Sequence, residues 1–193
     1  MINRPVWIGK WLLLLMLVAG CASPRERFYT LSAAPASAPG NEADLSVLIA
    51  PVAVPEIVDR PQFVVSKTAN RIEIAEFDRW AEPLKAGIAR VLAEDLAQEL
   101  GTPRVAAQAQ AISRDADYRV TFDVFRFDSR LGDGIALEAA WTVRAAKGGS
   151  SRIGRSVVQE PVQAADYEAL AAAHSRALQR YAREIAAAIR ALQ

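Results

Sequence analysis

The stretch YRVTFDVFRF, residues 118–127, decides the fold of this 193-residue chain. Its first apolar residues alternate with polar ones, the period of a half-buried β-strand: Tyr118, Val120, Phe122 and Val124. Phe125 and Phe127 then break the phase, which predicts a β-bulge or burial of both faces. A strand of this kind needs partners, and the neighbouring sequence offers them.

Two strands and a helix follow this stretch. Asp133-Gly134 is typical of a hairpin turn, and a clean alternation covers Ile135–Val143. Gly148-Gly149-Ser150 predicts a second turn, and Ile153–Val158 a third strand, so the three strands form an antiparallel meander. Asp166–Leu192 then predicts a long helix with Asp166 as its N-cap. Its apolar stripe comprises Leu170, His174, Leu178, Tyr181, Ile185, Ala188, Ile189 and Leu192.

Working backwards from residue 118, a second helix is predicted over Leu84–Leu100. Its apolar residues share one face, Gly101 ends it, and Pro103 prevents its continuation. Arg104–Ala107 is a candidate strand. Before the helix, Phe63–Lys67 and Arg71–Ala75 predict a hairpin around Thr68-Ala69-Asn70, with Ile72 and Ile74 on a buried face.

The first part of the chain is less regular. Phe28–Leu31 is a short β-prone run, and the Pro-, Ala- and Ser-rich segment 32–44 predicts a surface linker. Leu45–Ala50 predicts a strand, and the proline-containing segment 52–62 an extended loop. Together the elements predict an α/β fold: a single compact domain with one mixed sheet flanked by two main helices.

Cys21, the only cysteine, ends an apolar run of nine residues, Trp11–Ala19, and Arg4 and Lys10 precede that run. The spacing resembles a bacterial lipoprotein signal with the box Val18-Ala19-Gly20-Cys21. It implies removal of residues 1–20, acylation of Cys21, a tether over 21–27 and a periplasmic domain over 28–193. The alternatives fit less well. A membrane-spanning helix needs about 20 apolar residues, and a buried structural cysteine does not explain the flanking pattern.

Composition excludes several function classes. Removal of residues 1–20 takes Arg4 and Lys10 from the 23 basic residues and nothing from the 22 acidic ones, leaving 21 against 22 in 173 residues. A chain without a basic excess is not expected to bind nucleic acid. Since no cysteine other than Cys21 exists, packing rather than a disulfide must hold the domain.

Two motifs resemble those of one family. Val58–Val64 is followed by Asn70-Arg71 and then by Glu76–Leu84. With the Cys21 box and Phe28–Leu31, they are similar to the ABC-type transport auxiliary lipoproteins, also described as paraquat-inducible protein C-like lipoproteins or membrane integrity-associated transporter subunits.

The resemblance implies a fold and a role. The fold would be akin to the amino-terminal domain of the Tol-system β-propeller protein, an anticodon-binding-domain-like architecture. The role would be that of a palmitoylated lipoprotein on the periplasmic face of the outer membrane. There it would serve a tunnel protein with mammalian-cell-entry domains, which carries lipid between the two membranes. Ala22 fits this location, because Asp after the cysteine favours inner-membrane retention in many Gram-negative bacteria.

The same two motifs contain the candidate interface residues for the tunnel protein or for a homo-oligomeric ring: Asp59, Arg60, Pro61, Gln62, Arg79, Trp80 and Glu82. Pro61 stiffens the chain next to Arg60, whose guanidinium suits carboxylates across an interface. A local salt bridge is the alternative for Asp59 and Arg60. Trp80 is expected to anchor the hairpin to the helix, with Arg79 and Glu82 facing outward.

Other functions have weaker support. His174 is the only histidine and lies on an apolar stripe, which indicates a packed or an edge-exposed side chain rather than a catalytic one. No Gly-x-Ser-x-Gly elbow for a hydrolase, no metal-ligand motif and no cofactor motif occurs in the sequence, so we expect no enzyme. The alternative function is a lipid carrier, which would need a dry cavity lined by Phe122, Phe125, Phe127 or Trp141.

Overall fold

The predicted meander forms three long antiparallel strands, β6 (Tyr118–Arg130), β7 (Gly134–Ala145) and β8 (Ser151–Pro161). They belong to a computed structural model that describes residues 25–35, 44–107 and 116–193. The predicted signal segment, Cys21 and residues 36–43 of the predicted linker lie outside the described residues. On β7 the apolar residues of one face are buried and those between them are half-exposed, so the sheet has one covered and one open face.

The bulge predicted from the phase break is confirmed. The β6–β7 register shifts between Val124 and Arg126. The extra residue turns Phe125 outward, where half of it is exposed and the Arg155 guanidinium lies 4.6 Å from its ring centre. Phe127 returns to the covered face and is buried. One inserted residue therefore lets both faces carry an aromatic ring.

Two short strands complete the large sheet. β2 (Val47–Ile49) pairs in parallel with both β6 and β5 (Val105–Ala107), giving the order β5-β2-β6-β7-β8. The predicted loop 52–62 contains a 3₁₀ turn, η1 (Glu56–Val58), and one bridge from Ala53 to Asp123. The large sheet is thus mixed, as predicted.

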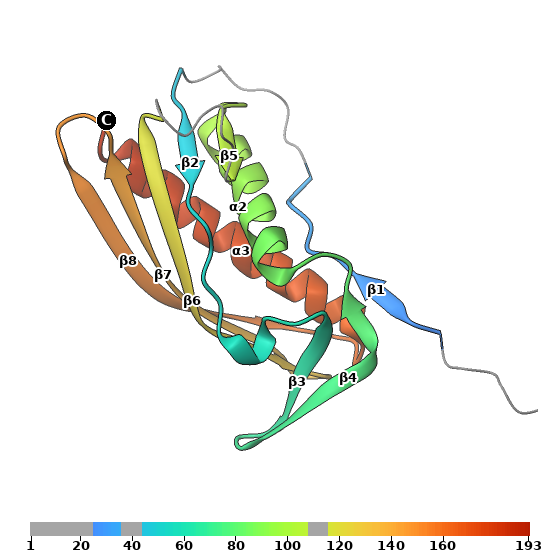
Figure 1. Ribbon diagram of the computed structural model, residues 1–193. Helices are drawn as coiled ribbons and strands as arrows, with labels where there is room; N and C mark the ends of the chain where they lie inside the picture. Colours follow the sequence, from blue (N-terminus) through green and yellow to red (C-terminus); the bar gives the residue numbers. More distant parts are fainter. Residues whose placement is uncertain (1–24, 36–43, 108–115) are drawn as a thin grey trace, which may run out of the picture.

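Two helices cover the closed face. α2 (Leu84–Leu100) has the predicted bounds and ends at Gly101, whose φ of 66° is the left-handed conformation that glycine adopts readily. α3 (Tyr167–Arg190) begins after Asp166, whose carboxylate accepts a hydrogen bond from the Ala169 N–H at 2.7 Å. Figure 1 shows α3 running along the meander with α2 beside it, and α2 packs on α3 and β5. The α/β class and both helices are confirmed.

A second, three-stranded sheet was not predicted. It contains β1 (Arg27–Tyr29), β4 (Arg71–Trp80) and β3 (Gln62–Thr68) in the order β1-β4-β3. The prediction of one sheet was wrong because β4 continues five residues past Ala75, and β1 pairs in parallel with that extension. Burial of Ile72 and Ile74 was wrong too: they are 45% and 42% exposed, because this arm of the hairpin extends beyond the helices and the large sheet (Figure 1).

Candidate functional site

The two predicted interface motifs meet in one corner of the molecule. The Trp80 N–H donates to the Pro61 carbonyl at 2.7 Å, and Gln62 lies opposite Arg79 in the β3–β4 register. β1 pairs with the same part of β4. We call this corner, residues 26–31, 59–62 and 78–82, the tether junction, because here the chain that follows Cys21 enters the domain.

Asp78 is the centre of the tether junction. Its buried carboxylate accepts one hydrogen bond from the Arg27 guanidinium at 2.8 Å and one from the Tyr29 hydroxyl at 2.7 Å, and Arg27 Nε forms an ion pair with it at 2.7 Å. Burial and this carboxylate raise the pKa of Tyr29 to about 12, so the phenol stays a donor at neutral pH. The sequence analysis missed these three residues. Their joint role depends on β1 pairing with β4, which no local pattern indicates.

Trp80 joins the tether junction to the core. It is buried, its ring stacks on Phe63 at 4.2 Å between centroids, and its edge meets Phe127 at 6.2 Å. Phe63 belongs to the small sheet and Phe127 to the large one. Trp80 was expected to anchor the hairpin to the helix; its ring contacts instead connect the two sheets.

Three predicted interface residues form ion pairs within the chain. Asp59 pairs with Lys85 at 2.6 Å. Arg79 pairs with Glu26 at 3.1 Å, and Glu82 with Arg90 at 2.7 Å. Each of the three side chains is about one-third exposed, so the pairs lie at the rim of the junction. They fix segments to one another before any partner is present.

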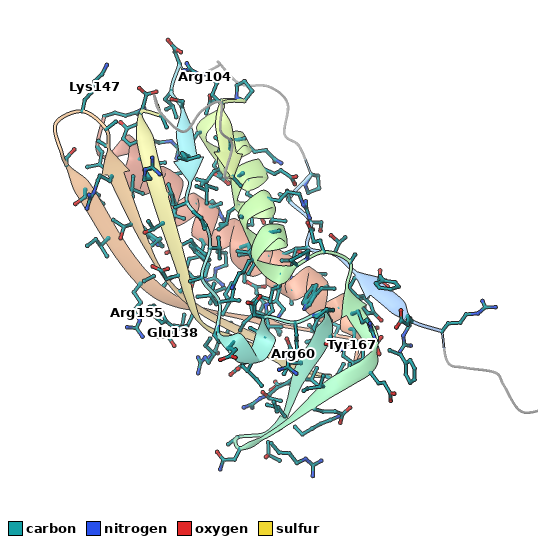
Figure 2. All side chains as sticks on the ribbon, viewed as in Figure 1. Arg60, Arg104, Glu138, Lys147, Arg155 and Tyr167 are labelled. Atoms are coloured by element: carbon teal, nitrogen blue, oxygen red, sulfur yellow. The ribbon has the colours of Figure 1, made fainter. Side chains whose placement is uncertain are left out.

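Arg60 differs from the other charged candidates. It makes no ion pair with another described residue. Its Nε atom is buried and has no hydrogen-bond partner among the described residues, whereas the side chain as a whole is half-exposed. Figure 2 shows Arg60 near the small sheet, on the side of the molecule away from the β7–β8 turn that carries Lys147. An arginine held this way keeps donors for an outside acceptor.

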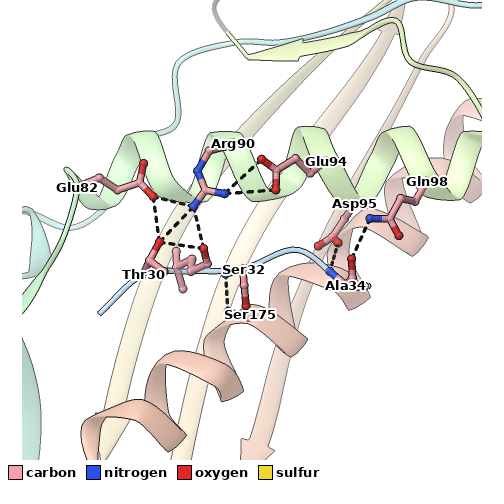
Figure 3. A network of polar contacts seen from close by, with 10 residues as sticks. Thr30, Ser32, Ala34, Glu82, Arg90, Glu94, Asp95, Gln98 and Ser175 are labelled. Atoms are coloured by element: carbon pink, nitrogen blue, oxygen red, sulfur yellow. Dashed lines mark hydrogen bonds and ion pairs between the residues drawn. The ribbon is translucent and has the colours of Figure 1, made fainter. Parts of the chain in front are cut away.

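Directly after β1, residues 30–34 run alongside α2 and contact both helices (Figure 3). Arg90 donates to the Leu31 carbonyl at 2.7 Å, and the Ser175 hydroxyl accepts the Ser32 N–H at 3.1 Å. The Ala34 N–H binds the Asp95 carboxylate at 2.8 Å, and burial raises the pKa of Asp95. The predicted surface linker therefore starts with an ordered strap, which composition alone did not indicate.

His174 and Ser129 form a buried polar pair. The Ser129 hydroxyl lies 2.8 Å from His174 Nε2, and the imidazole stacks on Phe127 at 3.7 Å. Burial lowers the pKa of His174 to about 3. A catalytic dyad needs access to substrate and an acid at the other ring nitrogen. Here both residues are buried, and Nδ1 has no hydrogen-bond partner among the described residues. Of the two predicted positions of His174, packed or edge-exposed, the structure shows the packed one.

The aromatic residues named for a lipid cavity do not line a common space. Phe122 packs edge-to-face on Tyr181, and Phe127 stacks on His174. Phe125 faces outward. Trp141 donates weakly to Glu184 and lines a surface groove of about 480 Å³ with Ile153 and Ala188. Phe122, Phe127 and Trp141 are buried and pack within the core.

Other classes of site were sought in the described part of the chain. Ranges 25–35, 44–107 and 116–193 contain no cluster of three or more His, Cys, Asp or Glu placed to hold a metal ion. In those ranges no helix combines the length and apolar character that a membrane span needs.

The profile of the family described as ABC-type transport auxiliary lipoprotein component matches residues 29–186. The chain belongs to this family. The match begins at the last residue of β1 and ends within α3, so it covers the large sheet, β3 and β4, and the tether junction from Tyr29 onwards.

Solved structures share the fold. An uncharacterised protein has a TM-score of 0.70 at 17% identity, over 86% of this chain and 99% of its own. Protein XCC0632 from Xanthomonas campestris has a TM-score of 0.67 at 19% identity, over 83% and 92%. The PelC dodecamer from Paraburkholderia phytofirmans is more distant, with a TM-score of 0.38 at 12% identity, over 80% and 90%. No curated protein matches the sequence.

Proposed function

We propose that this family member is a non-enzymatic lipoprotein on the periplasmic face of the outer membrane. It docks a tunnel protein with mammalian-cell-entry domains and so serves as the auxiliary subunit of an intermembrane lipid transport system. The family match supports an auxiliary lipoprotein. One structural observation carries the proposal: the chain that leaves the lipobox cysteine is built into the fold as β1 and held by Asp78.

The mechanism is positional. Cys21, once acylated, anchors the chain, and two or more acyl chains bind a bilayer stably where a single one does not. Residues 21–27 span at most about 20 Å when extended. The anchor therefore keeps the tether junction close to the bilayer and raises the local concentration of the domain next to its partner.

Arg60 is the best-supported contact for that partner. Asp59, Arg79 and Glu82 are paired within the chain, and Trp80 is buried. Pro61 and Gln62 hold the loop against β4. The tunnel protein would supply a carboxylate or backbone carbonyl to Arg60. Copies of this chain would surround the tunnel axis as a homo-oligomeric ring, which gives one Arg60 contact per copy.

The test is site-specific photo-cross-linking in cells. A photoreactive amino acid replaces Arg60 in the full-length chain, and a matched variant carries it at Ile153, which is exposed on β8. We expect a cross-link from position 60, but not from position 153, to a protein with mammalian-cell-entry domains. Cross-links from both positions alike, or from position 60 only to proteins without such domains, would contradict the docking role.

A further inference from the structure

The β3–β4 hairpin carries an uncovered apolar face. Ile72 and Ile74 alternate along β4, so both side chains point to one side of the strand, and each is more than two-fifths exposed. Their register partners on β3 are Ser66 and Val64. Neighbouring exposed isoleucines on a projecting arm are typical of a contact surface.

The direction of β1 relates this face to the anchor. β1 and β4 are parallel, with Arg27 opposite Asp78 and Tyr29 opposite Trp80. β4 runs from the hairpin tip at Arg71 towards the body of the domain at Trp80. At Asp78 the chain preceding Arg27 therefore leaves β1 on the side from which β4 approaches, and Figure 1 shows β1 and the hairpin in the same half of the molecule, away from the β7–β8 turn.

The lengths of the two segments agree. Six residues separate Ile72 from Asp78 on β4, and six separate Cys21 from Arg27. Extended chain advances about 3.3 Å per residue, so each segment spans at most about 20 Å. The segment between Cys21 and Arg27 is therefore long enough for a bilayer surface that holds the acyl chains of Cys21 to reach the level of Ile72.

We propose that the lipid surface covers the Ile72–Ile74 face of the hairpin. This inference rests on the anchoring at Cys21 that belongs to the proposed function. The two isoleucines enter the boundary between headgroups and acyl chains, and the polar residues of the tip, Thr68, Asn70 and Arg71, contact headgroups. Lys67 pairs with Glu73 at 3.1 Å on the other side of the hairpin, away from the isoleucines. The contact orients the domain, whereas the acyl chains hold it.

The test uses the acylated full-length protein. Since acylation consumes the only natural thiol, Ile72→Cys introduces one reactive thiol, and Ile153→Cys is the matched control. Ile153 is 75% exposed and lies near the β7–β8 turn, which Figures 1 and 2 place at the opposite end from the hairpin. Both variants are labelled with an environment-sensitive fluorophore and reconstituted into phosphatidylethanolamine–phosphatidylglycerol vesicles containing nitroxide-labelled lipid.

We expect the nitroxide lipid to quench the label at position 72 severalfold more strongly than the label at 153. Equal quenching at the two positions overturns the inference while leaving the anchor intact, provided that mass measurement shows acylated protein bound to vesicles. A blue shift of the label at 72 in detergent, without vesicles, that is lost on dilution of the protein shows that a second copy covers the face and overturns it as well. Protein that carries no acyl chain and stays off the vesicles contradicts the anchoring itself.

Discussion

The tether junction and the helix–sheet core each bury an ionisable side chain, and they treat it in opposite ways. At the junction Asp78 receives two hydrogen bonds and an ion pair from residues of β1. In the core His174 has one hydrogen bond, with Ser129, and an aromatic ring against its face. Polar partners distant in sequence fix where the tether enters, whereas apolar packing fixes whether the domain folds. Different residues thus position the tether and stabilise the folded domain.

The largest predicted effect comes from the residue that joins the two regions. Trp80→Ala removes the stack on Phe63 and the contact with Phe127. We expect the free energy of unfolding to fall by about 3–5 kcal/mol, as for other buried aromatic residues. Urea unfolding measures it. Phe125→Ala, at a half-exposed ring, is the control and should cost less than about 1 kcal/mol. Equal losses of unfolding free energy in both variants would contradict the role of Trp80 in connecting the two sheets.

Acid should weaken the core through His174. Its pKa is about 3 in the folded protein against 6.5 for a free histidine, so the fold favours the neutral ring. This stability is present above pH 6.5 and is lost as the pH falls towards 3, by about 3 kcal/mol at pH 4. Urea unfolding between pH 7 and 4 measures the loss. In His174→Gln this part of the pH dependence should vanish, although the variant is less stable at pH 7. If the unfolding free energy of His174→Gln depended on pH as that of the natural protein does, the lowered pKa of His174 would be contradicted.

A smaller and local effect is expected at the junction. Asp78→Asn keeps the shape but removes the charge that binds Arg27 and Tyr29. Hydrogen bonds to charged groups are about twice as strong as neutral ones. Amide exchange in β1 and residues 30–34 should therefore accelerate roughly tenfold, while exchange in β6 and β7 stays unchanged. Acceleration throughout the sheet would mean that junction and core are one cooperative unit.

The smallest effect is expected for Arg90→Ala. Its ion pairs with Glu82 and Glu94 are part-exposed, and such pairs contribute about 0–1 kcal/mol. Loss of the hydrogen bond to the Leu31 carbonyl should nevertheless loosen the strap. Amide exchange at Leu31 and Ser32 should accelerate, with a change in unfolding free energy of less than about 1 kcal/mol. A large loss of unfolding free energy would instead show that residues 30–34 stabilise the whole domain.

The sequence predicted the core better than the junction. The stripe on α2, the Asp166 cap and the bulge at Phe125 follow from local periodicity, and all three are confirmed. Ile72 and Ile74 show the limit of that reasoning. Alternation places two side chains on one side of a strand, but only tertiary structure decides what covers that side.

The junction depended on contacts that local patterns do not encode. Asp78 meets Arg27 across 51 positions of sequence, and Asp95 meets the Ala34 N–H across 61. The resemblance pointed to segments 59–62 and 79–82, which meet at the junction, without indicating that most of their charged side chains pair within the chain. Arg60 and Cys21 remain predicted functional residues.

Membrane fractionation of the full-length Cys21→Ser variant tests the central claim most directly, combined with an assay of outer-membrane integrity. The account predicts that the variant folds with unchanged thermal unfolding. It should leave the membrane fraction and no longer maintain outer-membrane integrity. A variant that stays on the membrane and remains fully active would contradict it.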